Sequence, residues 1–556
     1  MACVGRKYLA MSNSDFGIIA LEIYFPKFYV SQHDLEIADE CVGKYTQGLG
    51  QTSLGFCSIQ EDINSMCLTV VSNLMRRINL DLKTIGFLEV GTETIIDKSK
   101  STKTVLMQLF ETAGNFDVEG TDTKNACFGG TSALFGALNW LESSYCNGRM
   151  ALVVAADIAV YGDKSARSTG GAGAVAILLG PNAPLVIDFG LRAVYMKHCY
   201  DFYKPNLSSE YPIVDGHFSM QCYREALEMC YKLYRHKSAS KGLNSIITTP
   251  WRDTLPKVNN EVDYMCLHAP FTRLVQKAIG WLALIDMRTE GIIADTSNNS
   301  EVFLSSSKAG PLCHNNHQIT SKSEYFDQID PYIFNALKDY RLPDDKHIPD
   351  RQLDTICLKA TESLYRRKVD PGLMFAKNIG NMYTASLYAC LVSLLLNTSK
   401  AELLGRRILM YSYGSGMASA MYSILIHPDR DLSTILNCSL ESPNGLSNIH
   451  KRLFDERTQV TVSQFELMLK ERQLSHNSAP FEPTFRPEGL FPDFMRNYQN
   501  ARWISSLKHH NFVTLCLSRF IIKKKTIDLN EILIMSAELL PYACLIKVKC
   551  NQHNSL

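Results

Sequence analysis

The sequence lacks a surplus of one charge, an apolar run long enough to cross a bilayer, and any cysteine pair at C-x-x-C spacing. Lysine plus arginine (57) nearly balances aspartate plus glutamate (56), so the overall charge favours neither nucleic acid nor a membrane surface as a partner. Metal ligands are usually grouped at short spacing, and the 17 scattered cysteines predict neither a metal site nor a disulfide framework. The residues before Phe16 are too few and too weakly amphipathic for a mitochondrial transit peptide. We therefore expect reduced thiols and a cytoplasmic location.

Short apolar runs alternate with helical patterns from Gly17 onward, which is typical of a layered α/β fold. The predicted strands are 17–25, 85–90, 151–156, 174–179, 265–268 and 407–413. The predicted helices are 62–80, 126–141, 272–284 and 387–396. A glycine-rich turn stands beside a buried strand at 169–173 and again at 413–416, and this repetition suggests an internal duplication.

Composition divides the chain into four parts. A short extension covers 1–15, and two similar halves follow at 16–190 and 191–484. The second half includes a polar stretch at about 286–343, which we interpret as a surface insertion. The last part, 485–556, has no clear relation to the rest. We interpret it either as a divergent tail of uncertain structure or as translated intron or shifted-frame sequence.

A cysteine at the start of a helix is the first candidate for chemistry. Cys127 stands where a turn leads into the predicted helix 126–141, whose first turn contains Gly129 and Gly130. The partial positive charge of a helix N-terminus stabilises a thiolate, so we expect a lowered pKa for Cys127. The small neighbours leave room for a substrate. The alternative is a buried structural cysteine, which we expect most of the others to be.

Three further polar residues follow strands or turns. Glu93 comes just after the predicted strand 85–90, where an apolar cleft would raise its pKa toward that of a general base or acid; a helix cap or surface carboxylate is the alternative. His268 follows an apolar strand and is either a catalyst or a hydrogen-bonded core residue. Asn381 is a site residue or an ordinary turn residue. Acyl transfer followed by carbon–carbon bond formation needs a thiolate, a carboxylate base and polar groups for an oxyanion, which this set supplies.

Eight motifs occur in order between about Gly17 and about Ile426. They are GKYTQGLGQ at 43–51, GTETIIDKSKS at 91–101, NAC at 125–127, DIAVY at 157–161, YDFYKP at 200–205, SEYPIVDG at 209–216, GNMYT at 380–384 and YGSG at 413–416. With these motifs the chain resembles the hydroxymethylglutaryl-CoA synthases.

The resemblance implies a fold, a reaction and a set of catalytic residues. The fold is a thiolase-like, five-layered αβαβα arrangement of two duplicated halves, usually in a homodimer. The reaction is an acyl transfer that condenses acetyl-CoA with acetoacetyl-CoA, in the mevalonate pathway of isoprenoid and sterol-precursor synthesis. Cys127 is then the residue that is acetylated, Glu93 the base and acid, and His268 the residue that orients acetoacetyl-CoA. The CoA thioesters are substrates, and the resemblance implies neither a metal nor a prosthetic group.

The same resemblance implies a wider set of contacts. The expected substrate and CoA contacts are Cys41, Val42, Ser165, Thr169, Ser219, Arg273, Lys277, Asn381 and Ser415, and the expected supporting residues of the pocket are Asp157, Tyr161, Asp201 and Tyr383.

The chain departs from the family pattern at several positions. Arg273 replaces the usual lysine, Ser165 an asparagine, and Cys41 and Val42 an aspartate and a small residue. Arginine keeps the charge but presents a planar fork, so we expect a phosphate contact of altered geometry there. The aromatic-rich strand with which the family usually ends is not found after Pro483.

Two other functions stay open. One is a different thiolase-fold condensing enzyme, of the ketoacyl synthase type, although that group is not expected to carry the Glu93 motif or YDFYKP. The other is an inactive paralogue that acts as a scaffold, against which the intact Glu93, Cys127 and His268 argue. We therefore predict an active hydroxymethylglutaryl-CoA synthase.

Overall fold

Ten strands form one mixed sheet in the computed structural model, in the order β12-β13-β14-β8-β1-β7-β6-β4-β5 with β9 beside β14. The strands are β1 (Gly17–Tyr24), β4 (Ile85–Gly91), β5 (Asp122–Thr123), β6 (Met150–Ala159), β7 (Gly171–Gly180), β8 (Leu185–Ile187), β9 (Ala193–Met196), β12 (Val262–Leu267), β13 (Arg407–Gly414) and β14 (Ala418–Ile426). The structure describes residues 15–162, 164–240, 262–289, 351–436 and 448–476. All of them fall within one compact unit, Met1–Asn477.

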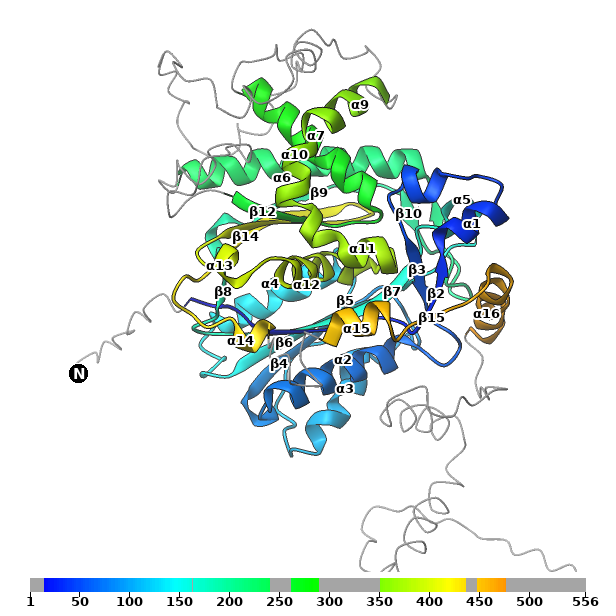
Figure 1. Cartoon of the computed structure of the whole chain (residues 1–556). Coiled ribbons are helices and arrows are strands. Elements are labelled where there is room, and N and C mark those ends of the chain that lie inside the picture. Colours follow the sequence, from blue (N-terminus) through cyan, green and yellow to red (C-terminus); the bar gives the residue numbers. More distant parts are fainter. Residues whose placement is uncertain (1–14, 163, 241–261, 290–350, 437–447, 477–556) are drawn as a thin grey trace, which may run out of the picture. The chain divides into compact units, whose positions relative to one another are not determined.

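Helices and strands alternate as five layers (Figure 1). The long helices are α2 (Ile63–Ile78), α3 (Thr102–Glu111), α4 (Gly129–Leu141), α6 (Gly216–Ser240), α7 (Thr272–Thr289) and α12 (Ser386–Asn397). One outer layer is α2 and α3, beside the sheet half made by β1, β4, β6 and β7. The central layer is α4 and α12, and beyond it lie β12, β13 and β14, covered by α6 and α7. The predicted five-layered fold is confirmed.

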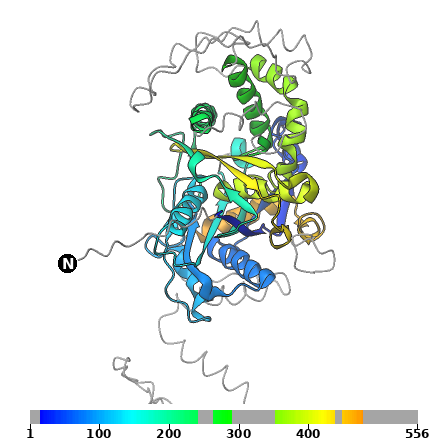
Figure 2. The ribbon, with the colours of Figure 1, turned by 90° about the vertical axis from the view of Figure 1, so that its left-hand side faces the viewer.

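Shorter elements complete the described residues. They are α1 (Gln32–Ala38), α5 (Lys164–Arg167), α9 (Arg351–Ala360), α10 (Glu362–Lys368), α11 (Met374–Ile379), α13 (Lys400–Leu403), α14 (Ser433–Leu436), α15 (Asn448–Phe454), α16 (Val462–Ser475), β2 (Phe28–Ser31), β3 (Ser53–Phe56), β10 (Phe202–Tyr203), β11 (Ile213–Val214) and β15 (Thr458–Gln459). Strands β2, β3 and β15 form a separate three-stranded sheet. Helix α9 lies side by side with α7 (Figure 2).

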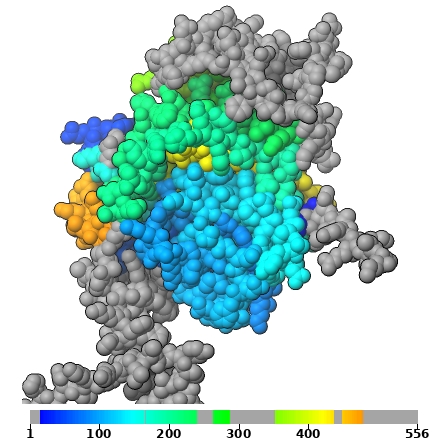
Figure 3. Space-filling view, turned by 180° about the vertical axis from the view of Figure 1, so that it is seen from behind, coloured from blue at the N-terminus to red at the C-terminus, as the bar shows by residue number. Residues whose placement is uncertain are grey.

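The two halves repeat one plan, as the glycine-rich turns suggested. In the first half β4 runs parallel to β6, which pairs antiparallel with β7; in the second, β12 runs parallel to β13, which pairs antiparallel with β14. A buried helix precedes each antiparallel pair, α4 before β6 and α12 before β13. Strand β8 joins the two halves because it pairs with both β1 and β14. From behind, the cyan and blue first half and the green part of the second meet along a seam (Figure 3).

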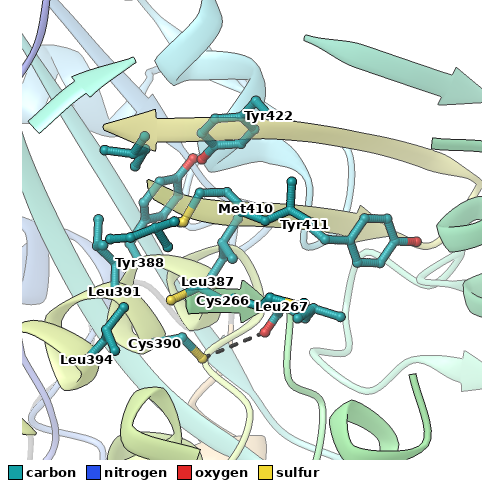
Figure 4. Packing of buried hydrophobic residues seen from close by; sticks show 14 of the residues in the cluster. Cys266, Leu267, Leu387, Tyr388, Cys390, Leu391, Leu394, Met410, Tyr411 and Tyr422 are labelled. Atoms are coloured by element: carbon teal, nitrogen blue, oxygen red, sulfur yellow. Dashed lines mark hydrogen bonds between the residues drawn. The ribbon is translucent and has the colours of Figure 1, made fainter. Parts of the chain in front are cut away.

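The sequence of α12 explains its place in the central layer. Every residue from Ser386 to Leu395 is buried, and a helix that is apolar on all sides must be enclosed on all sides. Figure 4 shows Leu387, Tyr388 and Leu391 of this helix against side chains of β12, β13 and β14. The thiol of Cys390 lies 3.7 Å from the carbonyl oxygen of Leu267 on β12.

Two helix boundaries differ from the sequence-based expectation. Helix α4 begins at Gly129 instead of at 126, because Ala126 has φ +43°, a left-handed conformation that no right-handed helix can include. Helix α7 continues to Thr289, so the first residues of the polar stretch 286–343 are helical; most of that stretch and the tail 485–556 lie outside the described residues. Within the described ranges, no helix has the length and apolarity to span a membrane, and the cysteines are free thiols.

Candidate active site

Two glycines allow the turn that carries Cys127 to lie between the halves. A Cβ atom at Gly91, the last residue of β4, would stand 2.4 Å from the backbone nitrogen of Gly130. A Cβ atom at Gly414, the last residue of β13, would stand 2.5 Å from the nitrogen of Phe128. Only glycine permits both approaches. The start of α4 therefore touches the ends of two strands, one from each half.

The environment of Cys127 reverses the predicted direction of its pKa shift. Burial raises the pKa of the thiol well above its ordinary value, and the negative charges of Glu93 and Asp157 raise it further, whereas the ammonium of Lys204 lowers it. Cys127 also stands two residues before the first residue of α4, outside the helix proper. Desolvation and two carboxylates therefore outweigh the helix N-terminus, and the prediction of a lowered pKa is wrong.

A raised pKa has a consequence for alkylation. We expect the rate at which iodoacetamide modifies Cys127 to keep rising with pH up to and beyond pH ~9, because the fraction of thiolate grows with each step in pH. Peptide mass spectrometry after timed quenching measures this rate for Cys127 alone. A plateau below pH ~8 would contradict the burial argument.

The loop after β4 carries Glu93 and is fixed by one buried carboxylate, that of Asp157 on β6. Asp157 Oδ1 accepts hydrogen bonds from the backbone nitrogens of Glu93 (2.8 Å) and Thr94 (3.1 Å) and from the hydroxyls of Thr92 (2.9 Å) and Thr94 (2.8 Å). Its other oxygen accepts from the backbone nitrogen of Thr384, 3.2 Å away. Burial and the neighbouring Glu93 charge raise the pKa of Asp157 to about 7. Asp157 thus ties the Glu93 loop to the turn before α12.

Lys204 belongs to this site, although the sequence analysis did not select it. Its ammonium lies 2.7 Å from Glu93 Oε1 and 4.9 Å from the centre of the Tyr383 ring. Tyr383 also contacts the rings of Tyr161 (6.3 Å) and Phe202 (5.7 Å) edge-on. The signal was present, because Lys204 lies inside the YDFYKP motif, but only the fold shows which carboxylate it meets.

Asp201 fixes the turn that contains Ser415. This buried carboxylate accepts hydrogen bonds from the hydroxyl of Tyr413 (3.0 Å) and from the backbone nitrogen of Gly416 (2.9 Å). The side-chain amide of Asn125 donates to the carbonyl oxygen of Ser415 at 3.3 Å. Ser415 is therefore held beside the turn of Cys127, and its expected contact with the substrate stays a prediction.

The turn before α12 is equally well fixed. Asn381 Oδ1 accepts from the backbone nitrogen of Tyr383 (2.8 Å) and from the hydroxyl of Ser386 (3.0 Å). The backbone nitrogen of Asn381 donates to the carbonyl oxygen of Gly170 (3.2 Å). Across the halves, the backbone nitrogen of Gly130 donates to the hydroxyl of Thr384. Both roles considered for Asn381 are thus compatible, since it shapes a turn and that turn borders the site.

His268 follows β12 and is almost fully buried. Its backbone nitrogen donates to the carbonyl oxygen of Tyr411 (2.8 Å), and its carbonyl oxygen accepts from the hydroxyl of Tyr223 (3.0 Å). Burial lowers the pKa of the imidazole to about 3, so the ring is neutral at physiological pH. Within the described residues its Nδ1 has no hydrogen-bond partner. A neutral ring with an unpaired nitrogen can donate to or accept from a substrate oxygen.

Several expected CoA contacts have protein partners instead. Lys277 pairs with Asp354 of α9 at 2.8 Å, and Arg273 donates to the carbonyl oxygen of Gln47 at 2.8 Å. The hydroxyl of Thr169 donates to the carbonyl oxygen of Ala166. The remaining expected contacts lie as follows: Cys41 in the turn after α1, partly buried; Val42 beside it, 74% exposed; Ser165 in α5; and Ser219 in the first turn of α6, partly buried. Their contacts with CoA stay predictions.

Comparisons with known proteins identify the family. The family model for the N-terminal region of hydroxymethylglutaryl-coenzyme A synthase matches residues 12–184, and that for the C-terminal region matches 185–309 and 304–497. The mitochondrial hydroxymethylglutaryl-CoA synthase of Mus musculus is 45% identical over 483 residues, which cover 86% of each chain. The cytoplasmic enzyme of Gallus gallus is 46% identical over 478 residues, 86% of this chain and 83% of that one.

A solved structure agrees with the sequence comparisons. MvaS in complex with 3-hydroxy-3-methylglutaryl coenzyme A superposes with a TM-score of 0.64 at 28% identity, over 86% of this chain and 95% of that one. The similarity to these enzymes thus extends along most of the sequence. It includes both halves of the layered fold and the turn that carries Cys127. The chain belongs to the hydroxymethylglutaryl-CoA synthase family.

Proposed function

We propose that the chain condenses acetyl-CoA with acetoacetyl-CoA and water to give (3S)-3-hydroxy-3-methylglutaryl-CoA and free CoA, through an acetyl thioester on Cys127. The observation that carries this proposal is the meeting of a thiol, Cys127, with a carboxylate, Glu93, at the junction of the two halves. Acyl transfer to sulfur and proton removal from carbon need this pair of groups in one place.

In the first step the Cys127 sulfur attacks the acetyl thioester and CoA leaves. Since the thiol is protonated at rest, its proton is lost as the sulfur–carbon bond forms and ends on the sulfur of the CoA that leaves. In the second step the Glu93 carboxylate takes a proton from the acetyl methyl group. The resulting enolate attacks the ketone carbon of acetoacetyl-CoA, and the neutral imidazole of His268 donates to the ketone oxygen. Water then cleaves the enzyme thioester.

We assign no metal or prosthetic group to these steps, because acyl transfer, proton transfer and addition to a ketone use groups that the residues supply; the CoA thioesters are substrates. We also propose that the enzyme acts as a homodimer in the cytoplasm, in the mevalonate pathway. The relatives support this compartment only in part, since they include both cytoplasmic and mitochondrial enzymes.

Mass spectrometry after brief incubation with acetyl-CoA tests the proposal. We expect one acetyl group on the Cys127 peptide of the wild-type protein and none in Cys127→Ala, because that substitution removes the sulfur that is acetylated. Cys146→Ala, which changes a buried thiol in the turn after α4, should take up acetyl like the wild type.

The acceptor is tested next. Acetoacetyl-CoA added to the acetylated protein should release product, whereas an acyl carrier protein loaded with an acyl group should not. Release only with the carrier protein would favour a ketoacyl synthase. A folded wild-type protein that takes up no acetyl group would favour the scaffold function.

A further inference from the structure

We propose that Lys204 is a positioning residue of the condensation step, one whose ammonium pairs with the Glu93 carboxylate and holds it in the orientation in which it can take the methyl proton. This inference rests on the proposed function and adds a residue to it. Lys204 acts through Glu93 and does not itself touch the reacting carbon.

The two side chains form a close ion pair. The nitrogen of Lys204 lies 2.7 Å from Glu93 Oε1, with side chains that are 21% and 6% exposed. The ammonium also stands over two aromatic faces, 4.9 Å from the centre of Tyr383 and 5.8 Å from that of Phe202. Water reaches such a pair poorly, so the attraction between the charges is only weakly screened.

The charges around Glu93 show why a cation is needed there. Four groups face Glu93. They are Asp157 on β6, Tyr161 just after β6, Cys127 in the turn before α4 and Tyr383 in the turn before α12. None of these four groups can carry a positive charge. Two carboxylates that lie close together repel each other, and a positive charge nearby reduces that repulsion. Among the groups that the structure shows facing Glu93, Lys204 supplies the positive charge.

The segment that carries Lys204 is fixed at both ends. Before it, the carbonyl oxygen of Asp201 accepts from the backbone nitrogen of Asp215 at 3.0 Å, and β10 pairs with β11. After it, Glu210 pairs with Arg472 of α16 at 2.6 Å, and Arg472 also donates to the carbonyl oxygen of Glu61 at 2.9 Å. The ammonium therefore approaches Glu93 from a rigid hairpin of the second half.

This arrangement assigns separate tasks to the two carboxylate oxygens. Oε1 of Glu93 is engaged by the ammonium, and the other oxygen takes the proton when the carbon–hydrogen bond breaks and the electron pair passes into the enolate. A neutral carboxyl group could not accept that proton. The ammonium of Lys204 thus holds the Glu93 carboxylate in place for the step that starts the condensation.

The test compares Lys204→Met and Lys204→Arg with the wild-type protein. Each is measured for acetyl groups per chain at completion, for kcat and KM with acetoacetyl-CoA, and for its unfolding temperature. We expect Lys204→Met to reach full acetylation of Cys127, with kcat about 10- to 100-fold lower and KM little changed, because a base that is no longer held in place takes the methyl proton less often. Lys204→Arg should restore most of kcat.

Lys197→Met provides a matched control, since Lys197 forms an exposed pair with Glu225 at 2.9 Å; it should behave like the wild type. A wild-type kcat in Lys204→Met would overturn the inference. So would a lower kcat that Lys204→Arg does not restore, together with a lower unfolding temperature, which would mark a purely structural role. If the wild-type protein itself takes up no acetyl group, the proposed function fails first, and the two failures are thereby distinguished.

Discussion

Glu93→Gln should still accept an acetyl group on Cys127 but should lose condensation by about 10²- to 10⁴-fold. An amide cannot take the methyl proton, so no enolate forms. The first half-reaction should survive because the charge of Glu93 raises the pKa of Cys127, and its removal makes the thiolate more accessible. The two half-reactions should therefore separate in this variant.

Quenched samples analysed by mass spectrometry follow acetylation, and release of CoA after addition of acetoacetyl-CoA follows condensation. Glu89→Gln is the matched control: Glu89 lies on the same strand, β4, and its Oε1 accepts a hydrogen bond from the hydroxyl of Thr123, which an amide oxygen can also accept. We expect nearly full activity there. Condensation at the wild-type rate in Glu93→Gln would remove Glu93 from the proposed mechanism.

Asp157→Ala should lower the free energy of unfolding by about 3–5 kcal/mol and abolish condensation. The substitution leaves buried donors of Thr92, Glu93, Thr94 and Thr384 without their acceptor, and it frees the loop that presents the base. Urea unfolding followed by circular dichroism measures the first effect, and CoA release the second.

Asp157→Asn is the comparison, since its carbonyl oxygen can still accept the hydrogen bonds made to Oδ1. It should lose less than half as much stability as the alanine variant. An alanine variant that unfolds at the wild-type urea concentration would show that the loop is held by other contacts.

Much of the fold could be predicted because it depends on local patterns. Strands such as β1 and β13 and the apolar helix α12 follow from runs of apolar residues between turns, and their boundaries lie within a few residues of the expected ones. The start of α4 could not be predicted, because the left-handed conformation of Ala126 is imposed by the packing of Gly91 and Gly414 against the turn.

The sequence indicated which residues form the site, but it did not indicate how their charges change one another's pKa values. Cys127 and Glu93 were selected from motifs and do lie together. The direction of the Cys127 pKa shift was wrong because it depends on Asp157 and Glu93, which reach the thiol only through the tertiary fold. For the same reason the sequence could not show that Lys277 pairs with Asp354, which lies on a different helix.

The two turns before the central helices have a further consequence. Ala126 and Tyr383, with φ +43° and +41°, each stand three residues before the first residue of α4 and α12. Cys127 and Thr384 are therefore counterparts, and the hydroxyl of Thr384 receives the amide of Gly130 from the opposite copy. One of the two equivalent turns carries the reactive sulfur, and the other contacts the helix that follows it. A change at Thr384 can therefore shift the turn of Cys127 through Gly130, although Thr384 belongs to the other half.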